Sequence, residues 1–119
     1  MPKLEEYYYE QKLEEDPKTM SYNKGYNVSY DGYHYDTGCI DFPKDKWKAS
    51  YEKRIKDNKF FAYIKDNEIN EYVGYVNYQY NRIDDRYECG ILIEYKYRGE
   101  GYSKDALILL IKEAYKNNI

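Results

Sequence analysis

The stretch Ile91-Leu92-Ile93-Glu94-Tyr95-Lys96-Tyr97-Arg98-Gly99-Glu100-Gly101-Tyr102-Ser103-Lys104 decides the fold, because it joins an apolar strand to a helix through a glycine-containing turn. Gly99 and Gly101 let the chain turn sharply and keep Cβ atoms away from its main-chain N–H groups. The first N–H groups of the following helix lack intrahelical partners, and the helix dipole favours negative charge there. The stretch therefore predicts a main-chain cradle for a pyrophosphate, with a purely structural turn as the alternative.

Two other nucleotide motifs do not fit this stretch. The dinucleotide fingerprint G-x-G-x-x-G would place its third glycine at Lys104, and too little chain follows for the acidic ribose ligand. The P-loop pattern G-x-x-x-x-G-K-[ST] does not occur in the chain.

The spacing Arg98-x-x-Gly101-x-Ser103 resembles the acetyl-CoA signature of the GNAT N-acetyltransferase superfamily, written [QR]-x-x-G-x-[GA]. The residues before it (Tyr87 to Ile93) and after it (Asp105-Ala106-Leu107) follow the order that this superfamily shows. Ser103 departs from the usual glycine or alanine but is small. The resemblance implies an acetyl-CoA-dependent N-acetyltransferase that acts on a primary amine and needs no metal.

Apolar periodicity predicts the remaining elements. We expect helices over 3–15, 17–23, 43–57 and 101–116 and strands over 60–65, 71–80 and 86–94. A hairpin turn at Asp31-Gly32 is expected to join strands Val28–Tyr30 and Tyr33–Tyr35. Two helix faces are expected to be buried, one with Trp47, Tyr51 and Ile55 and one with Leu107, Leu110, Ile111 and Ala114.

This order looks like the first half of the GNAT fold, in a single domain over 1–119. The predicted class is α/β (α+β), with a mostly antiparallel central sheet of three or more strands flanked by helices. The chain is expected to be C-terminally short, without the later strands of the full fold, and to replace the usual first strand with the hairpin.

Composition excludes several classes of function. The formal net charge of −3 offers no basic excess for a nucleic acid partner. The chain has no apolar run long enough to span a membrane, and Cys39 and Cys89 suggest neither a disulfide framework nor a metal site. We expect a cytoplasmic protein.

The resemblance also implies which residues hold the cofactor. The main chain of the strand would pair with the pantetheine arm, the turn would hold the pyrophosphate, and Arg98 and Lys104 would add positive charge. Glu100 has the wrong charge for an anion site, so its side chain is expected to face water. The expected cofactor-binding residues are Ile91, Leu92, Ile93, Arg98, Gly99, Glu100, Gly101, Tyr102, Ser103 and Lys104.

Glu88 is the candidate general base, because it lies on the expected cofactor strand. The alternative is a solvent-facing or salt-bridged strand residue. His34, the only histidine, has a suitable ordinary pKa but ranks below Glu88.

The loop 25–42 is expected to form the wall of the acceptor site, as the corresponding segment does in the superfamily. Its Tyr26, Tyr30, His34 and Asp36 would bind a polar or cationic amine through hydrogen bonds and cation–π contacts. The acceptor remains open between a small molecule, such as an aminoglycoside or a polyamine, and a peptide N-terminus.

Two classes of function therefore remain: an N-acetyltransferase, and a truncated, non-catalytic module that binds CoA or associates with itself. The short chain leaves the strand 86–94 at a sheet edge, which favours a homodimer through that edge.

Overall fold

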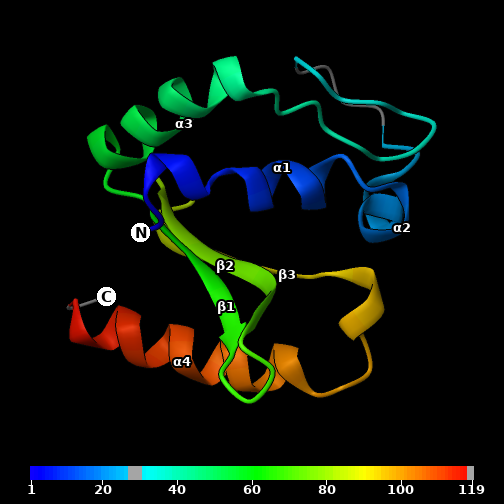
Figure 1. The fold of residues 1–119 in the computed structure, drawn as a ribbon. Coiled ribbons are helices and arrows are strands. Elements are labelled where there is room, and N and C mark those ends of the chain that lie inside the picture. Colours follow the sequence, from blue (N-terminus) through cyan, green and yellow to red (C-terminus); the bar gives the residue numbers. More distant parts are fainter. Residues whose placement is uncertain (27–30, 118–119) are drawn as a thin grey trace. The chain divides into compact units, whose positions relative to one another are not determined.

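The computed structural model describes residues 1–26 and 31–117, and it divides the chain into two compact units. One unit is Lys3–Glu52, and the other is Lys53–Ile119 together with Met1–Pro2. The described residues form four α-helices and a three-stranded antiparallel sheet (Figure 1). This confirms the predicted α+β class and the antiparallel sheet. The expectation of one domain over 1–119 stays a prediction.

The unit Lys3–Glu52 is mostly helical. It contains the 3-10 turn η1 (Leu4–Glu6), α1 (Tyr8–Glu14), α2 (Pro17–Met20), the 3-10 turn η2 (Ser21–Asn23) and most of α3 (Lys44–Lys56). Its core gathers Tyr7, Phe42 and Trp47, with Leu4 and Tyr51 packed beside them.

The local signals explain where these helices start. Asp16 is the N-cap of α2, because its Oδ1 accepts a hydrogen bond from the Lys18 N–H, and Pro17 occupies the first helical position. The helix predicted over 3–15 is split instead, because the Lys3 N–H donates to the Glu6 carboxylate at 2.9 Å and the first turn tightens to η1.

The predicted hairpin is wrong in its described part, and Val28–Tyr30 lie outside the described residues. Tyr33 pairs with Ile40 instead, and the His34 N–H donates to the Cys39 carbonyl at 2.8 Å. Asp31 and Gly32 lie in a turn, as predicted, and a second turn follows where the Gly38 N–H donates to the His34 carbonyl at 2.8 Å. These local bonds place Tyr35 in a turn rather than in a strand.

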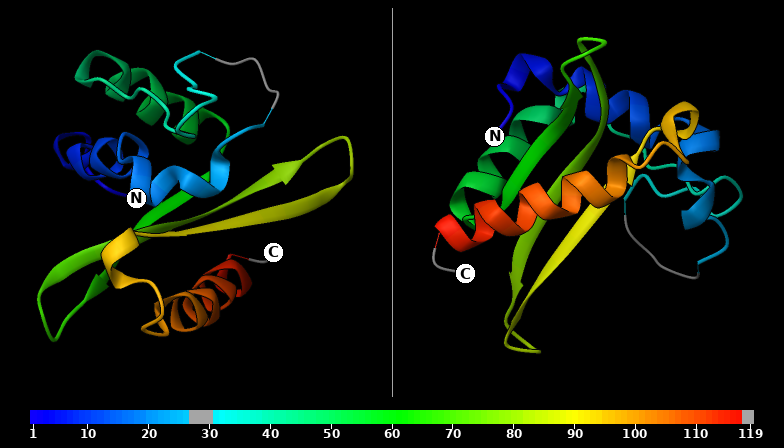
Figure 2. Two further views of the ribbon diagram at one scale, coloured as in Figure 1. Left: turned by 90° about the vertical axis from the view of Figure 1, so that its right-hand side faces the viewer. Right: turned by 90° about the horizontal axis from the view of Figure 1, so that it is seen from below.

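The second unit contains the sheet. Strands β1 (Phe60–Asp66), β2 (Glu71–Asn81) and β3 (Arg86–Ile93) lie in the order β1-β2-β3, so β1 and β3 are its edges. The 3-10 turn η3 (Tyr95–Tyr97) and helix α4 (Tyr102–Lys116) follow. Helix α4 covers one face of the sheet, and the two hairpin turns lie at opposite ends of it (Figure 2).

The buried stripe of α4 differs from the prediction. Ala106 and Leu110 are buried against Val76 and Tyr78, with Ala114 beside them. The predicted members Leu107 and Ile111 are 38% and 56% exposed. Small residues at i−4 and i+4 from Leu110 let the helix approach the sheet closely, so the contact face turns toward the alanines. On α3, Trp47 is buried as predicted but Ile55 is exposed.

One residue interrupts the alternation of β2. Ile64 pairs with Gly74, but the next residue of β1, Lys65, pairs with Tyr72, so Val73 is an extra residue, a β-bulge. A Cβ at Gly74 would lie 2.0 Å from the Leu92 carbonyl oxygen, so only glycine fits beside β3 there.

Candidate functional site

The segment Arg98–Gly101, which we call the glycine loop, joins η3 to α4. Gly99 and Gly101 both have φ of +84°, and no atom lies within 4 Å of the position that a Cβ would take at either. Glycine is therefore required for backbone conformation, and the space beside the loop is open. Gly101 caps α4 without a side-chain hydrogen bond, which leaves the first N–H groups, from Tyr102 onward, available to an anion.

Two tyrosines fix the ends of the glycine loop to the β1–β2 hairpin. The Tyr97 hydroxyl donates to Glu71 Oε2 at 2.6 Å, and the Tyr102 hydroxyl donates to Asp66 Oδ2 at 2.5 Å. The two rings meet edge to face, with centroids 6.0 Å apart. We call these four residues the tyrosine clamp, because they hold both sides of the loop without occupying it.

The tyrosine clamp perturbs its own titrating groups. The hydrogen bond to Glu71 raises the pKa of Tyr97 to about 12, and the hydrogen bond to Asp66 raises the pKa of Tyr102 to about 12. The same bond from Tyr102, followed by a main-chain bond from Glu68, lowers the pKa of Asp66. Both phenols are therefore protonated donors at neutral pH, and they do not supply a base there.

Only alternate residues of β3 present main-chain groups to its outer edge. The Glu94 N–H donates to the Val73 carbonyl at 2.8 Å, which shows that the main-chain groups of Glu94 face β2. Because these groups alternate along an antiparallel ladder, the main chain of Leu92 is used within the sheet. The N–H and C=O groups of Ile91 and Ile93 face the edge, where the structure describes no further strand.

Arg98 supports this edge in a way the sequence did not indicate. Its Nε donates to the Ile93 carbonyl at 3.1 Å, which ties the end of β3 to the glycine loop. The charges around the loop are mixed, because Glu100 within the loop and Lys104 shortly after it are both exposed. Oriented N–H groups, more than net charge, are therefore what the loop offers to an anion.

Glu88 lies elsewhere on β3, opposite Gln79 and toward the β2–β3 turn. Its Oε1 accepts a hydrogen bond from Asn81 at 2.8 Å and lies 4.0 Å from an Arg86 guanidinium nitrogen. The structure thus places Glu88 in a hairpin network, separated from the glycine loop by the second half of β3. Its role as the general base stays a prediction.

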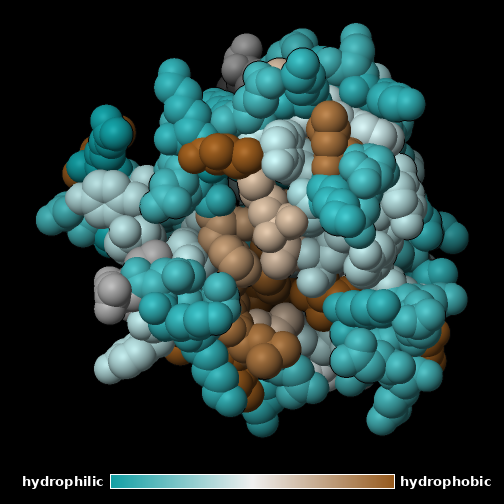
Figure 3. Space-filling view, turned by 60° about the vertical axis from the view of Figure 1, so that its left-hand side comes forward, coloured by the Kyte–Doolittle hydropathy of each residue, from teal (hydrophilic) through white to brown (hydrophobic). Residues whose placement is uncertain are grey.

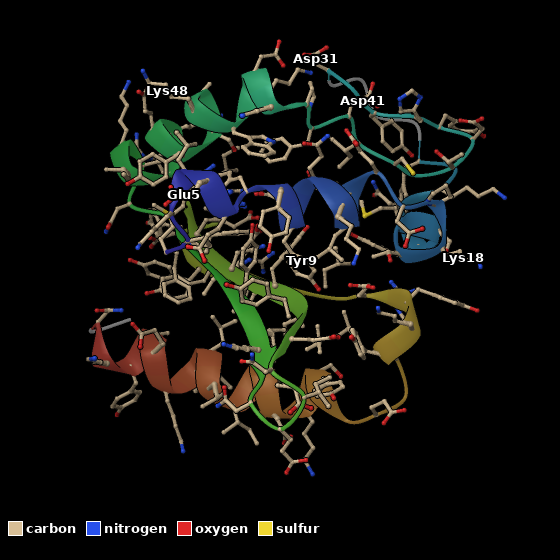
Figure 4. The ribbon with its side chains drawn as sticks, viewed as in Figure 1. Glu5, Tyr9, Lys18, Asp31, Asp41 and Lys48 are labelled. Carbon is tan, nitrogen blue, oxygen red and sulfur yellow. The ribbon has the colours of Figure 1, made fainter. Side chains whose placement is uncertain are left out.

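The predicted acceptor residues belong to the unit Lys3–Glu52, and Tyr30 lies outside the described residues. Tyr26 donates its N–H to the Tyr33 hydroxyl at 3.2 Å, and Asp36 lies exposed in a turn. His34 Nε2 lies 2.8 Å from Asp41 Oδ1, in an exposed pair on the loop before α3. Asp41 and Asp31, which pairs with Lys46 at 3.0 Å, are labelled in Figure 4.

Sequence reasoning missed the partners of the glycine loop. None of Asp66, Glu71 and Tyr97 was predicted as a site residue. The same holds for Glu94, which is 6% exposed and whose carboxylate lies 3.7 Å from the Lys96 ammonium group. The available signal was a pair of tyrosines flanking the glycines. Nothing in the sequence indicated which carboxylates they would reach.

An apolar surface accompanies the sheet. Leu107, Ile108, Leu109 and Ile111 of α4 are all exposed, and a groove of about 280 Å³ runs between α4 and the β1 edge. The groove is lined by Phe60, Ala62 and Ile64 of β1 and by Leu109 and Leu110 of α4, among others. Figure 3 shows apolar side chains gathered most densely in the lower half of one face, at the height of α4 in Figure 1.

No family model, curated protein or solved structure matches this chain. Within residues 1–26 and 31–117, no helix has both the length and the apolar character needed to cross a membrane. In the same residues, no three histidine, cysteine, aspartate or glutamate side chains gather in a metal-binding arrangement.

Proposed function

We propose that the chain is an acetyl-CoA-dependent N-acetyltransferase of the GNAT type that acts on a primary amine. One observation carries the proposal: an open loop with two left-handed glycines leads into the uncapped N-terminus of α4, directly after an edge strand. The sequence resemblance of Arg98-x-x-Gly101-x-Ser103 supports the same assignment.

In this proposal each part of the site has one task. The N–H groups at the start of α4 bind the pyrophosphate of CoA, and the tyrosine clamp keeps them oriented before the ligand arrives. The edge-facing groups of Ile91 and Ile93 bind the amide-rich arm as a further strand would. Acetyl-CoA supplies the activated acetyl group.

The remaining tasks concern the amine. It must lose a proton before it attacks, and Glu88 is the proposed base. The loop with Tyr26, Tyr30, His34 and Asp36 is the proposed acceptor wall, and the acceptor is a small-molecule or peptide amine.

Binding of CoA tests the proposal directly. CoA at millimolar concentration should raise the melting temperature, because a ligand that binds only the folded state stabilises it. Gly101→Val should abolish the shift, because valine tolerates φ near +84° poorly and blocks the loop. Gly25→Val is the matched control, since Gly25 has the same φ of +84° and equally open space. Absence of both a thermal shift and calorimetric heat with the unaltered chain would refute the proposal.

A second candidate is self-association, and the exposed apolar residues of α4 together with the open β3 edge favour it. A second copy of the chain could pair along β3 and cover these residues in a two-fold dimer. This candidate uses the same edge groups, Ile91 and Ile93, as the cofactor, so the two modes compete.

A further inference from the structure

A second cavity lies at the other end of the sheet from the glycine loop. It has a volume of about 500 Å³ and is lined by Lys56–Lys59, which end α3 and begin the next turn, and by Gln79, Tyr80 and Arg82 at the end of β2. We call it the basic pocket. Since β3 has 8 residues and rises by about 3.3 Å per residue, the strand is roughly 25 Å long, and the basic pocket and the glycine loop lie toward its opposite ends.

The charge of the basic pocket is opposite to that of the chain. Lys56, Lys59 and Arg82 line it with a single carboxylate, Asp57, although the chain has a formal net charge of −3. Among the described residues, none of these three cationic side chains forms an ion pair or a hydrogen bond. Their charge is therefore not neutralised within the part of the chain that the structure describes.

The acidic residues next to Arg82 are engaged with other groups. Asp84 Oδ2 lies 3.5 Å from Arg86 and accepts a hydrogen bond from Asn81 at 3.3 Å. Asp85 accepts a hydrogen bond from the Tyr80 hydroxyl. This bond is the main reason that the pKa of Tyr80 is raised, and the charge of Arg82, which lines the same pocket, acts in the opposite direction.

The end of α3 does not cancel this positive charge. A helix C-terminus normally presents bare carbonyl groups that repel anions. Here the turn closes on the helix in a Schellman arrangement: Lys59 N–H donates to the Arg54 carbonyl at 2.9 Å and Asn58 N–H to the Ile55 carbonyl at 3.2 Å. Asn58 takes the left-handed conformation that this closure requires, with φ of 52°.

We propose that the basic pocket binds the phosphate group of a small molecule. Three cations with the amide donors of Asn58 and Gln79 can surround a dianion that accepts hydrogen bonds on several oxygens. A cavity of this size suits a small ligand, and the net negative charge of the chain disfavours a nucleic acid. The proposal is independent of CoA binding at the glycine loop.

Amide chemical shifts measured at constant ionic strength test the proposal. Inorganic phosphate and glycerol 3-phosphate serve as two separate probes, and chloride serves as the reference salt. Saturable shifts at Asn58, Lys59 and Arg82 are expected, and tighter binding of glycerol 3-phosphate would identify a phosphate ester as the preferred form. Arg82→Gln and Lys59→Gln should each weaken binding roughly tenfold, the loss expected from one charge-assisted hydrogen bond.

The matched control is Lys48→Gln, which removes an exposed lysine of the same helix α3 that does not line the basic pocket (Figure 4). It should leave phosphate binding unchanged, and Gly101→Val should do the same while removing CoA binding. Shifts that do not saturate, that chloride reproduces, or that Lys48→Gln reduces as much as Arg82→Gln does would overturn the proposal. Spectra of the free variants verify that each remains folded.

Discussion

Tyr102 begins helix α4, and its hydroxyl donates a hydrogen bond of 2.5 Å to Asp66 at the end of β1. With the bond from Tyr97 to Glu71, this contact fixes the glycine loop from both sides. A binding loop that is already ordered loses less conformational entropy when its ligand arrives. The tyrosine clamp thus links the sheet to the affinity of the proposed cofactor site.

Removing the two hydroxyls should loosen the loop without unfolding the protein. In the variant Tyr97→Phe/Tyr102→Phe we expect faster amide exchange at Gly99 and Gly101, and CoA affinity reduced roughly 3- to 10-fold by the loss of preorganisation. Hydrogen exchange and calorimetry measure the two effects. Tyr115→Phe, at a tyrosine that is 81% exposed, is the control. Unchanged exchange at both glycines would show that the clamp does not hold the loop.

The same hydroxyls predict an alkaline change in stability. The pKa values of Tyr97 and Tyr102 rise from the ordinary 10.0 to about 12 in the folded state, so folding favours the protonated phenols. Their contribution to stability is full below pH 10 and is lost as the pH rises through 12. The urea midpoint of the unaltered chain should therefore converge on that of Tyr97→Phe/Tyr102→Phe over this range. A difference that stays constant up to pH 12 would contradict the assigned shifts.

Leu110 and Leu109 of α4 provide an internal test of the fold. Leu110 is 4% exposed and Leu109 is 65% exposed, although the two are adjacent in the chain. Leu110→Ala should lower the free energy of unfolding by about 2–4 kcal/mol, because it leaves a cavity against the sheet. Leu109→Ala should change it by less than about 0.5 kcal/mol. Denaturant unfolding of both variants measures the difference, and equal losses would mean that α4 packs on another face.

Glu88 can be tested separately from the hydrogen bonds that hold it. If it is the base, Glu88→Gln should lower kcat by roughly 10²–10⁴-fold and alter the pH–rate profile. Asn81→Ala removes the donor to Glu88 but keeps the carboxylate, so it should retain most of the activity. The assay follows release of free CoA with a panel of amines. Equal losses in the two variants would assign Glu88 to the hairpin network instead.

Competition distinguishes the cofactor site from the self-association surface. Both modes use the outward main-chain groups of Ile91 and Ile93, so saturating CoA should shift a dimer toward monomer in sedimentation velocity. Ile91→Lys places a charge on the edge strand and should weaken the dimer in the absence of CoA. A protein that sediments as a monomer at high concentration would exclude the dimer. A dimer whose sedimentation is unchanged by saturating CoA would show that the dimer and the cofactor do not use the same edge.

Local sequence patterns were sufficient for the elements and for the glycine loop. Alternation gave the strands to within one residue of β1, β2 and β3, and Gly101 marked the start of α4. Periodicity did not predict which face of α4 is buried, because Leu107 and Ile111 fit a helical apolar stripe as well as Ala106 does. Packing against the sheet selects the face with Ala106. The prediction for the loop before α3 failed for another reason: Asp31 and Gly32 do lie in a turn, but a second turn with bonds at His34 and Thr37 takes up Tyr35, where a strand was expected.

The partners in the site lay beyond any local pattern. The bond between Tyr102 and Asp66 joins residues that are 36 positions apart, and the cations of the basic pocket come from two separate segments of the chain. A sequence gives the types of such residues but not their distances. Glu94 stands out in the sequence as a carboxylate at the end of a predicted apolar strand, but its burial follows only from the packing of the sheet.

The bulge at Val73 has a consequence far from its own strand. With regular alternation through Val73, Glu71 would lie on the same side of the sheet as Val73 and Tyr75, and Asp66 would lie on the opposite side. Because the bulge leaves Val73 unpaired, Glu71 pairs with Asp66, so both acceptors of the tyrosine clamp lie on the same side of the sheet. The orientation of the Glu71 carboxylate is thus set by the bulge at Val73, although Glu71 lies 26 positions before Tyr97, whose hydroxyl donates a hydrogen bond to it. If the strand took up Val73 by regular alternation instead of by a bulge, every chemical group of the clamp would remain in the chain, and yet its two acceptors would lie on opposite sides of the sheet.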